Sequence, residues 1–404
     1  MTQNDLSVDA FKDGEAIFAQ WVSPMSLGDL FTDIWAKQAH LFTGGPSEKL
    51  DGLLDEQAID AFLGADVLPA HYLKVVTAEH IFGRHQWATL DTRRDFDAIH
   101  IVDQRRLFAL FGNGATIIIG AAEGHFQPLK ECCDALQAFF GFRVQANIYI
   151  TPPNAQGLPA HYDDHDVIVA QISGEKDWYI HGCPVSEPTS QQSYQGDRTT
   201  KHSDSQIYGL AKGDIFYVPR GWMHEAISKA GHSIHITFGL HQPMLCDVVA
   251  ELAQKASADQ AFRLRRPLPI ASQDERVEFS RKISQLIEHA SAMMPYGGTV
   301  ESNPSTPSFL EVLAIEHLTI DNWVQASPNC QPAITHNNNE MNIAHGTQSI
   351  TFPKFLMPIV DQLLSGIPVQ ISKLSGLANS NGKIEIAQKM LRAGLLEFFD
   401  QDAP

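Results

Sequence analysis

The sequence has few cysteines and no long apolar run, and both shortages narrow what the protein can be. Its five cysteines form no CxxC pair and leave one over in any pairing, which argues against a disulfide scaffold or a zinc ribbon and is typical of a reducing compartment. No apolar run approaches the roughly 18 residues of a membrane-spanning helix. The acidic start, MTQNDLSVDAFKDGEAIFAQW, lacks the layout of a signal peptide. We therefore expect a cytoplasmic protein without a membrane partner.

Basic residues are also scarce. Lysine and arginine total 29 against 47 aspartates and glutamates, giving a formal net charge of −18. Such a chain repels phosphate backbones, so we expect no direct nucleic-acid partner, whereas a basic protein segment would be attracted. Hydrophobic residues make up 44% of the 404 residues, which excludes global disorder and predicts about two or three domains.

The middle of the chain consists of short β-branched or aromatic runs separated by glycine, proline and asparagine. The runs are 144–150, 167–173, 178–180, 206–210, 214–218 and 233–239. Short strands at close spacing with turn residues between them predict a β-sandwich or barrel of the jelly-roll type.

Helical periodicity surrounds this β-rich part. Before it, the predicted helices are 25–42, with Ser26 as N-cap, and 127–140, closed by Gly141; the tract between them, 48–125, mixes short signals and ends in a β-run at 115–119. After it, the predicted helices are 244–256 and 274–294, followed by a polar linker at 296–307 and by helical segments at 309–315, 353–364, 371–374 and 383–393. The last segments suggest a winged-helix-like module. It lacks a basic helix, so we interpret it as a protein-contact module.

One stretch carries the chemistry. In GLPAHYDDHDVIVAQISGEKDWYIH, His161 and Asp163 are spaced i and i+2, so on a strand both side chains project from one face. In GDIFYVPRGWMHEA, His224 follows a strand and a tight Gly–Pro–Gly turn. Two imidazoles and one carboxylate on one face of a metal, with the opposite face open, is the arrangement of non-haem Fe(II) oxygenases.

The open face needs a partner that brings electrons for splitting O₂, and a 2-oxo acid does this. Its far carboxylate needs a cation. Lys176 follows the Gly174 turn on the next predicted strand, where it can face inward with Trp178 and Ile180. Losing a buried cation that is paired with this carboxylate would cost on the order of 3–5 kcal/mol.

Nearby residues offer alternatives. His165 shares a face with His161 and Asp163, but three ligands on one short strand would crowd each other, so we expect a pocket-wall residue. His235 could replace His224, although it lacks the turn context. Asp164 and Asp166 are expected to be solvated or hairpin-rim carboxylates.

These motifs, together with QANIYITP and HSIHITF, resemble the JmjC-type ribosomal oxygenases, the cupin 4 group of hydroxylases dependent on Fe(II) and 2-oxoglutarate. The likeness is strongest over about 112–241, and DIWAKQAHLFTGG resembles the family's entry segment. It implies an α+β fold with a double-stranded β-helix (jelly-roll) core. The domains would be an oxygenase domain with an N-terminal α/β flank at 1–241, a helical dimerisation region at 242–300 and a winged-helix-like domain at 301–404.

The resemblance also implies roles for residues. His161, Asp163 and His224 would bind iron and Lys176 the 2-oxoglutarate carboxylate. Three further residues would line the cosubstrate pocket: Asn147, Tyr149 and Thr237. The chain departs from its relatives at His165, at Asp166–Val167 and at Gly239, where relatives offer a small hydroxyl side chain.

The implied function is hydroxylation, with Fe(II), 2-oxoglutarate and O₂, of a side-chain carbon, chiefly the β-carbon, of an arginine, a histidine or a similar residue in a protein. The expected partners are a basic ribosomal protein loop as substrate and a second copy of the chain. Alternatives are a dedicated precursor peptide or a small molecule as substrate, N-methyl-lysine demethylation, a cupin enzyme that does not use 2-oxoglutarate, and a non-catalytic binding module.

Overall fold

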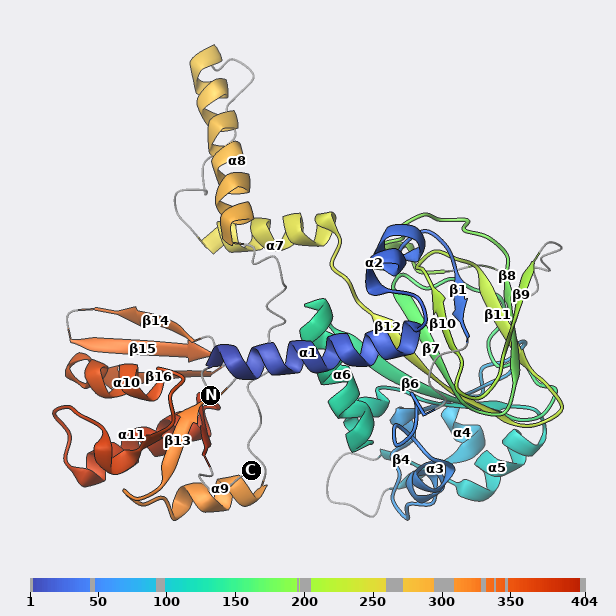
Figure 1. Ribbon diagram of the computed structural model, residues 1–404, viewed down its shortest axis with the longest axis horizontal. Helices are drawn as coiled ribbons and strands as arrows, with labels where there is room; N and C mark the ends of the chain where they lie inside the picture. The colour runs from blue at the N-terminus through green and yellow to red at the C-terminus, as the bar shows by residue number, and fades with distance from the viewer. Residues whose placement is uncertain are drawn as a thin grey trace. The chain divides into compact units, whose positions relative to one another are not determined.

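The computed structural model describes residues 3–43, 48–91, 99–194, 196, 205–258, 272–293, 309–327, 332–337, 339–345 and 348–399. The chain divides into two compact units (Figure 1). One is Asp13–Gly298, and the other combines Met1–Lys12 with Thr299–Pro404. Each unit is described by itself.

The larger unit is built on a jelly roll of antiparallel strands, as predicted. A seven-stranded sheet has the order β1-β10-β7-β12-β6-β5-β2, and a three-stranded sheet has the order β11-β8-β9. The strands of the first sheet are β1 (His40–Phe42), β2 (Leu73–Val76), β5 (Thr116–Ile119), β6 (Val144–Thr151), β7 (Asp166–Ser173), β10 (Ile215–Val218) and β12 (Ser233–Leu240). Those of the second are β8 (Lys176–Ile180), β9 (Gln206–Leu210) and β11 (His224–Ser228).

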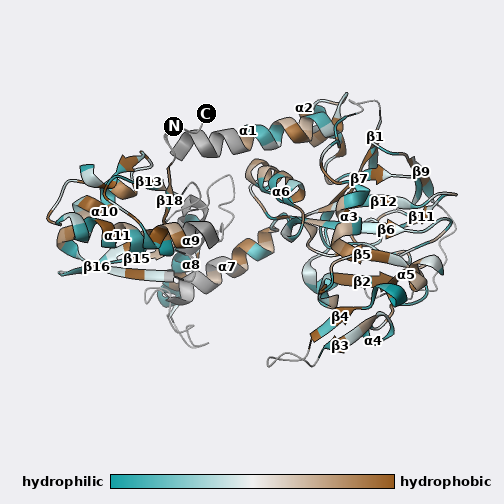
Figure 2. Ribbon diagram, turned by 90° about the horizontal axis from the view of Figure 1, so that it is seen from below, coloured by the Kyte–Doolittle hydropathy of each residue, from teal (hydrophilic) through white to brown (hydrophobic). Residues whose placement is uncertain are grey.

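Strand β7 shows how the two layers are filled. Successive side chains of a strand point to opposite faces. Ile168 and Ala170 pack into the large core that also contains residues of α1 (Gln3–Val22) and α6 (Gln127–Phe140). Val167 and Val169 pack with Trp178 of the second sheet in a smaller core. Because both faces are covered, β7 is almost entirely buried. The apolar, brown segments of β2 and β5 in Figure 2 belong to the large core.

Helix α6 has the predicted ends, and Gly141 closes it in the left-handed conformation with φ 74°. The helix predicted at 25–42 begins as expected but is too long. Ser26 does cap a helix, accepting from the Asp29 backbone N–H, but α2 (Leu27–Asp29) passes into the π-helical turn η1 (Leu30–Ile34) and ends there. Ala36 then adopts φ 59°, and residues 40–42 pair with β10 as an edge strand. Sheet pairing therefore overrides the local helical periodicity.

The remaining elements of this unit flank the sheets or follow them. The flanking elements are α3 (Glu56–Leu63), η2 (Ala70–Tyr72), α4 (Arg84–Trp87), β3 (Ala88–Asp91), β4 (Ile99–Val102), α5 (Gln104–Gly112), η3 (Ala122–Gly124) and η4 (Ser190–Gln192). The two helices predicted after Pro243 are α7 (Leu245–Ala258) and α8 (Gln273–Met293). The predicted linker at 296–307 lies outside the described residues. Among the described helices, none is long and apolar enough to cross a membrane.

The smaller unit has its own apolar core and two three-stranded antiparallel sheets, β17-β13-β18 and β14-β15-β16. Its helices are α9 (Phe309–Glu316), η6 (Lys354–Leu356), α10 (Met357–Leu363), η7 (Ile371–Lys373) and α11 (Ser380–Arg392). Its strands are β13 (Trp323–Ala326), β14 (Ala333–His336), β15 (Glu340–His345), β16 (Gln348–Pro353), β17 (Val369–Gln370) and β18 (Leu396–Phe398). The helices lie close to the predicted segments, while most of the strands were not anticipated. The winged-helix-like interpretation stays a prediction.

Candidate metal centre and cosubstrate pocket

The structure brings His161, Asp163 and His224 together. One potential ligand atom from each lies within 4.8 Å of the others. His161 and His224 face each other across an isolated antiparallel bridge, with N–O distances of 3.0 and 2.7 Å in its two hydrogen bonds. Asp163 is not on a strand, contrary to the expected strand geometry, but in the irregular segment that leads into β7. The bridge thus brings together two histidines that are far apart in sequence.

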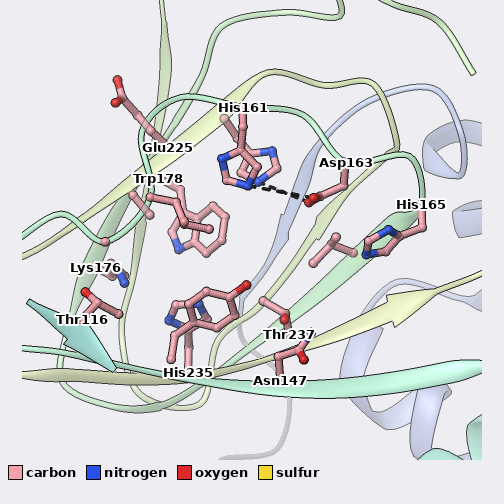
Figure 3. A pocket seen from close by; sticks show the side chains of 16 residues that line it. Thr116, Asn147, His161, Asp163, His165, Lys176, Trp178, Glu225, His235 and Thr237 are labelled. Carbon is pink, nitrogen blue, oxygen red and sulfur yellow. Dashed lines mark ion pairs between the residues drawn. The ribbon is translucent and has the colours of Figure 1, made fainter. Parts of the chain in front are cut away.

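Both histidines are oriented for ligation through the same ring nitrogen. His161 Nδ1 lies 2.8 Å from the Pro159 carbonyl oxygen, and His224 Nδ1 lies 2.9 Å from that of Trp222. A carbonyl only accepts, so each Nδ1 carries the proton and each Nε2 keeps a free lone pair. These Nε2 atoms lie 3.9 and 3.6 Å from the Asp163 carboxylate (Figure 3).

The protonation states also suit a cation. Burial, with a smaller contribution from His161, lowers the pKa of His224 to about 4. Burial opposes ionisation of Asp163, but the surrounding histidines outweigh it and hold the pKa of that carboxyl below its ordinary value. At neutral pH the site therefore presents a neutral His224 imidazole and an ionised Asp163, the forms in which these residues bind metals.

The turn before His224 is fastened to the Asp163 segment. Gly221 adopts φ 79°, and its N–H donates to the Asp163 carbonyl at 2.9 Å. Next to it, Arg220 N–H donates to Asp166 Oδ1 at 2.8 Å, and the Tyr217 hydroxyl donates to Asp166 Oδ2 at 3.0 Å. Asp166 is only 2% exposed, so the expectation of a solvated or rim carboxylate is wrong for this residue. It is buried because it satisfies donors of the turn that carries a candidate ligand.

Lys176 lies in the same cavity and is 2% exposed. It begins β8 directly after the Gly174 turn, where φ is 67°, and shares a face with Trp178 and Ile180. Its Nζ donates to the Thr151 hydroxyl at 2.9 Å, and within the described part of the chain no carboxylate lies at ion-pair distance from it. Burial lowers the pKa of Lys176 to about 7. The site thus holds an amine that an anion would restore to its charged form.

His235 is next to this lysine, not in the metal set. Its ring stacks on Tyr149 at 4.8 Å, and burial and then Lys176 lower its pKa well below the ordinary value. Three buried polar atoms here have no hydrogen-bond partner among the described residues: the two ring nitrogens of His235 and the indole nitrogen of Trp178. Unsatisfied buried polar groups are costly. The alternative in which His235 replaces His224 as a metal ligand is therefore wrong, because the cluster contains His224. The position of His235 in the cavity beside Lys176 was not anticipated from the sequence.

The cavity has a volume of about 110 Å³, and Lys176 and His165 lie at opposite ends of it (Figure 3). Asn147, Tyr149 and Thr237 line this cavity, and their expected contact with the cosubstrate stays a prediction. Asn147 Oδ1 also accepts from the Ala121 backbone N–H at 3.1 Å. Further lining residues that the sequence did not indicate are Thr116, Gly157, Leu158, Glu225 and Ala226.

His165 forms part of the wall, as expected. Its ring stacks on His241 with centroids 4.5 Å apart. A Cβ added to Gly239 would lie 3.0 Å from the His165 ring. The two departures from the family pattern are thus physically linked, because glycine at 239 leaves the space that the His165 ring fills.

Comparison with known proteins agrees with this geometry. Residues 122–248 match the JmjC domain model. A relative described as "Bifunctional lysine-specific demethylase and histidyl-hydroxylase NO66", from Drosophila persimilis, is 28% identical over 302 residues, 71% of this chain and 42% of that protein. The protein of the same description from Drosophila sechellia is 33% identical over 173 residues, 41% of this chain and 26% of the relative. The chain thus spans less than half the length of these relatives.

Among solved structures, YcfD, a ribosomal oxygenase from Escherichia coli in complex with cobalt and succinic acid, aligns with a TM-score of 0.51. The alignment covers 93% of this chain and 99% of that one at 12% identity, so it speaks for the fold. The JmjC match over residues 122–248 and these relatives confirm the resemblance of this chain to the JmjC-type ribosomal oxygenases.

Proposed function

We propose that the protein is an oxygenase dependent on Fe(II) and 2-oxoglutarate. The observation that carries this proposal is one cavity with an open His–Asp–His set and a buried lysine that lacks a carboxylate partner among the described residues. The donor set fits Fe(II), since two imidazoles and a carboxylate bind on one side and leave positions free. Bound there, Fe(II) would supply O₂ chemistry, with 2-oxoglutarate as the source of electrons.

The chain's own residues bind and orient. His161, Asp163 and His224 hold the metal, and the Pro159 and Trp222 carbonyls fix the two rings. Lys176 pairs with the far carboxylate of 2-oxoglutarate. Further hydrogen bonds to the cosubstrate can come from a ring nitrogen of His235 and from the Trp178 indole N–H, which have no partner among the described residues.

The proposed reaction hydroxylates a side-chain carbon, the β-carbon, of an arginine or histidine in a protein. Overall, 2-oxoglutarate and O₂ give succinate and CO₂, and one oxygen atom replaces a C–H bond with C–OH. The names of the similar proteins, a histidyl-hydroxylase and a ribosomal oxygenase, support a ribosomal protein as substrate. The acidic chain, with net charge −18, suits a basic substrate loop.

A second candidate reaction is N-methyl-lysine demethylation, which the description of the same relatives favours. The hydroxylated carbon is then the methyl group, which leaves as formaldehyde. Formaldehyde release during substrate turnover distinguishes demethylation from stable C-hydroxylation. Mass spectrometry of the product also separates a ribosomal protein from a dedicated precursor peptide or a small molecule.

The deciding experiment is anaerobic addition of Fe(II) and 2-oxoglutarate to wild type and to Lys176→Ala. We expect the weak visible charge-transfer band of a chelated 2-oxo acid in wild type and a weaker band in the variant. Iron binding without any band in wild type would refute the use of 2-oxoglutarate and favour another cupin chemistry.

We also propose that the protein is cytoplasmic and forms a homodimer through residues 242–300. The domain limits then lie at 241 and 300, and the last domain is a winged-helix-like protein-contact domain. Support comes from apolar side chains that are exposed on α7 and α8: Leu245 is 79% exposed and Val249 54%, with Val277 and Ile283 also exposed. A second copy covering them would remove this apolar surface from water. The molecular mass in solution tests this. A dimeric wild type and a monomeric Leu245→Glu variant would support the proposal, and a monomeric wild type would contradict it.

A further inference from the structure

Gln171 is a buried amide on the inner face of the jelly roll. It follows Val167 and Val169 at intervals of two along β7, and those valines pack in the smaller apolar core. Gln171 is 0% exposed and does not line the cavity that contains Lys176. A polar side chain thus occupies a place where the preceding residues of the same face are apolar.

The amide nitrogen of this side chain joins two segments that are far apart in sequence. Gln171 Nε2 donates to the carbonyls of Ser173, at 2.8 Å, and Gly174, at 3.3 Å, where β7 ends and the next turn begins. It also donates to the Ser233 hydroxyl at 2.9 Å, at the start of β12. Gln171 Oε1 has no hydrogen-bond partner among the described residues. Because an unsatisfied buried oxygen is costly, the N–H donors are what this side chain contributes.

Each of the two segments leads directly to a residue of the proposed cosubstrate site. Lys176 begins β8 two residues after Gly174, and His235 lies two residues after Ser233 on β12. The turn packs tightly on the approach to β12, since a Cβ added to Gly174 would lie 1.9 Å from the His232 carbonyl oxygen. The Gln171 amide therefore ties the approach to Lys176 to the approach to His235.

The pairing of β7 with β12 changes register at the same place. The two strands pair Ile234 with Ser173 and then His235 with Gln171. Ile172 is thus the extra residue of a β-bulge, a feature that re-aims side chains next to active sites. Cross-strand partners share a face of the sheet, which puts Gln171 and His235 on one face. The Gln171 amide spans the bulge, because it bonds to Ser173 on the other side of it.

We infer that Gln171 is a positioning residue for the cosubstrate end of the cavity. Its carboxamide holds the turn before Lys176 against the start of β12, and it acts on the cosubstrate only through Lys176 and His235. Without these hydrogen bonds the two segments can separate, and the amine of Lys176 loses its fixed place. The identity of the ligand rests on the proposed function, whereas the placement of Lys176 can be measured without any ligand.

Gln171→Met tests this, because methionine keeps the length of the side chain and removes the N–H donors. The anaerobic charge-transfer band measures the affinity of the Fe(II) protein for 2-oxoglutarate and for 2-oxobutyrate, a 2-oxo acid without the far carboxylate. We expect Gln171→Met to bind 2-oxoglutarate about tenfold more weakly. Its affinities for Fe(II) and 2-oxobutyrate should stay those of wild type. The matched control Ile168→Ala shortens a β7 side chain in the large core, so it should lower stability and keep all three affinities.

A measurement without ligand follows the lysine itself. Burial lowers the pKa of Lys176 to about 7, and NMR of the lysine ε-carbon, assigned with Lys176→Met, follows this titration in the metal-free protein. Gln171→Met should raise the pKa of Lys176 toward its ordinary value, because water reaches an amine that is no longer held. Ile168→Ala should leave it unchanged.

Equal losses of affinity for 2-oxoglutarate and 2-oxobutyrate in Gln171→Met would overturn the inference, as would an unchanged pKa of Lys176. If Gln171→Met does not fold by circular dichroism, Ser233→Ala decides, since it removes the hydroxyl that accepts from Gln171. A smaller change in the same direction is then expected, and no change contradicts the inference. A raised pKa of Lys176 in Gln171→Met, without the iron–2-oxoglutarate band in wild type, would refute the proposed function alone.

Discussion

Replacing Lys176 by methionine should stabilise the free protein, although it removes a residue of the proposed site. The lysine is 2% exposed, and burial lowers its pKa from 10.5 to about 7. A difference of about 3.5 pKa units at about 1.36 kcal/mol each corresponds to a cost on the order of 5 kcal/mol below about pH 7, where the amine is charged in both the folded and the unfolded chain. Methionine keeps the length of the side chain without the amine, so chemical denaturation at pH 6 should give a larger free energy of unfolding for Lys176→Met.

The sign of the pH dependence follows from the lowered pKa. Between about pH 7 and pH 10.5 the unfolded chain binds more protons at Lys176 than the folded protein does. The free energy of unfolding of wild type therefore rises with pH through this window, and the advantage of Lys176→Met shrinks toward its upper end. Denaturation curves at pH 6 and pH 9 measure this difference.

The same substitution should abolish tight binding of 2-oxoglutarate. The far carboxylate would lose its cation in a buried place, which costs on the order of 3–5 kcal/mol, or more than about a hundredfold in affinity. Calorimetry of 2-oxoglutarate binding to the anaerobic Fe(II) protein measures it. Lys229→Met is the matched control, since Lys229 is 44% exposed and pairs with Glu175 and Asp177. That exposed network should contribute little to either quantity. A Lys176→Met protein that is less stable than wild type at pH 6, or that binds 2-oxoglutarate equally well, would refute the reasoning.

Three further predictions test the metal centre and its surroundings. His224→Ala should lower metal affinity by at least about a hundredfold while the far-ultraviolet circular dichroism stays that of wild type; wild-type affinity in a metal titration would remove His224 from the ligand set. Binding of 2-oxoglutarate should take up a proton at pH 8, because the carboxylate raises the pKa of Lys176 from about 7. The affinity should therefore fall by up to about tenfold for each pH unit above pH 7. Calorimetry in buffers of different ionisation enthalpy measures the proton uptake, and no uptake would contradict the prediction. Gly221→Ala would place a Cβ 1.9 Å from the Val185 carbonyl oxygen at φ 79°. This substitution should lower the free energy of unfolding by about 2–4 kcal/mol and weaken metal binding. A variant that unfolds at the same temperature as wild type would show that the turn tolerates a side chain.

Strands and helices with strong local signals could be predicted from the sequence. The α6 sequence has helical periodicity, a proline near its start and a glycine at its end, and the structure has the same limits. The β-run of β7 is largely apolar on both faces, which fits a strand covered on both sides. In β6 and β12 apolar side chains alternate with polar ones, which fits strands with one face in the core and one face toward a polar cavity. The spacing in HYD and the Gly–Pro–Gly turn before His224 identified residues that meet in one cavity.

Features that depend on long-range partners could not be predicted in the same way. The helical periodicity at 25–42 gives no sign that β10 offers an edge to His40–Phe42. Asp166 looks like a loop carboxylate in the sequence, and only the fold shows that its oxygens accept from Arg220 and Tyr217. One signal for His235 was available, because it alternates with Thr237 on β12 and so shares its face.

The arrangement of donors explains why this cavity suits ligands better than a closed core would. The backbone already satisfies the candidate metal ligands on their outer side, at His161 Nδ1 and His224 Nδ1. On the inner side, the His235 ring nitrogens and the Trp178 indole nitrogen have no hydrogen-bond partner among the described residues. The Lys176 amine donates there to the Thr151 hydroxyl. These buried polar atoms face the cavity, and the cost of leaving them unsatisfied is removed when a dicarboxylate binds. Free energy lost in the free protein therefore returns as affinity for 2-oxoglutarate, which is why the stability and the cosubstrate affinity of Lys176→Met should change in opposite directions.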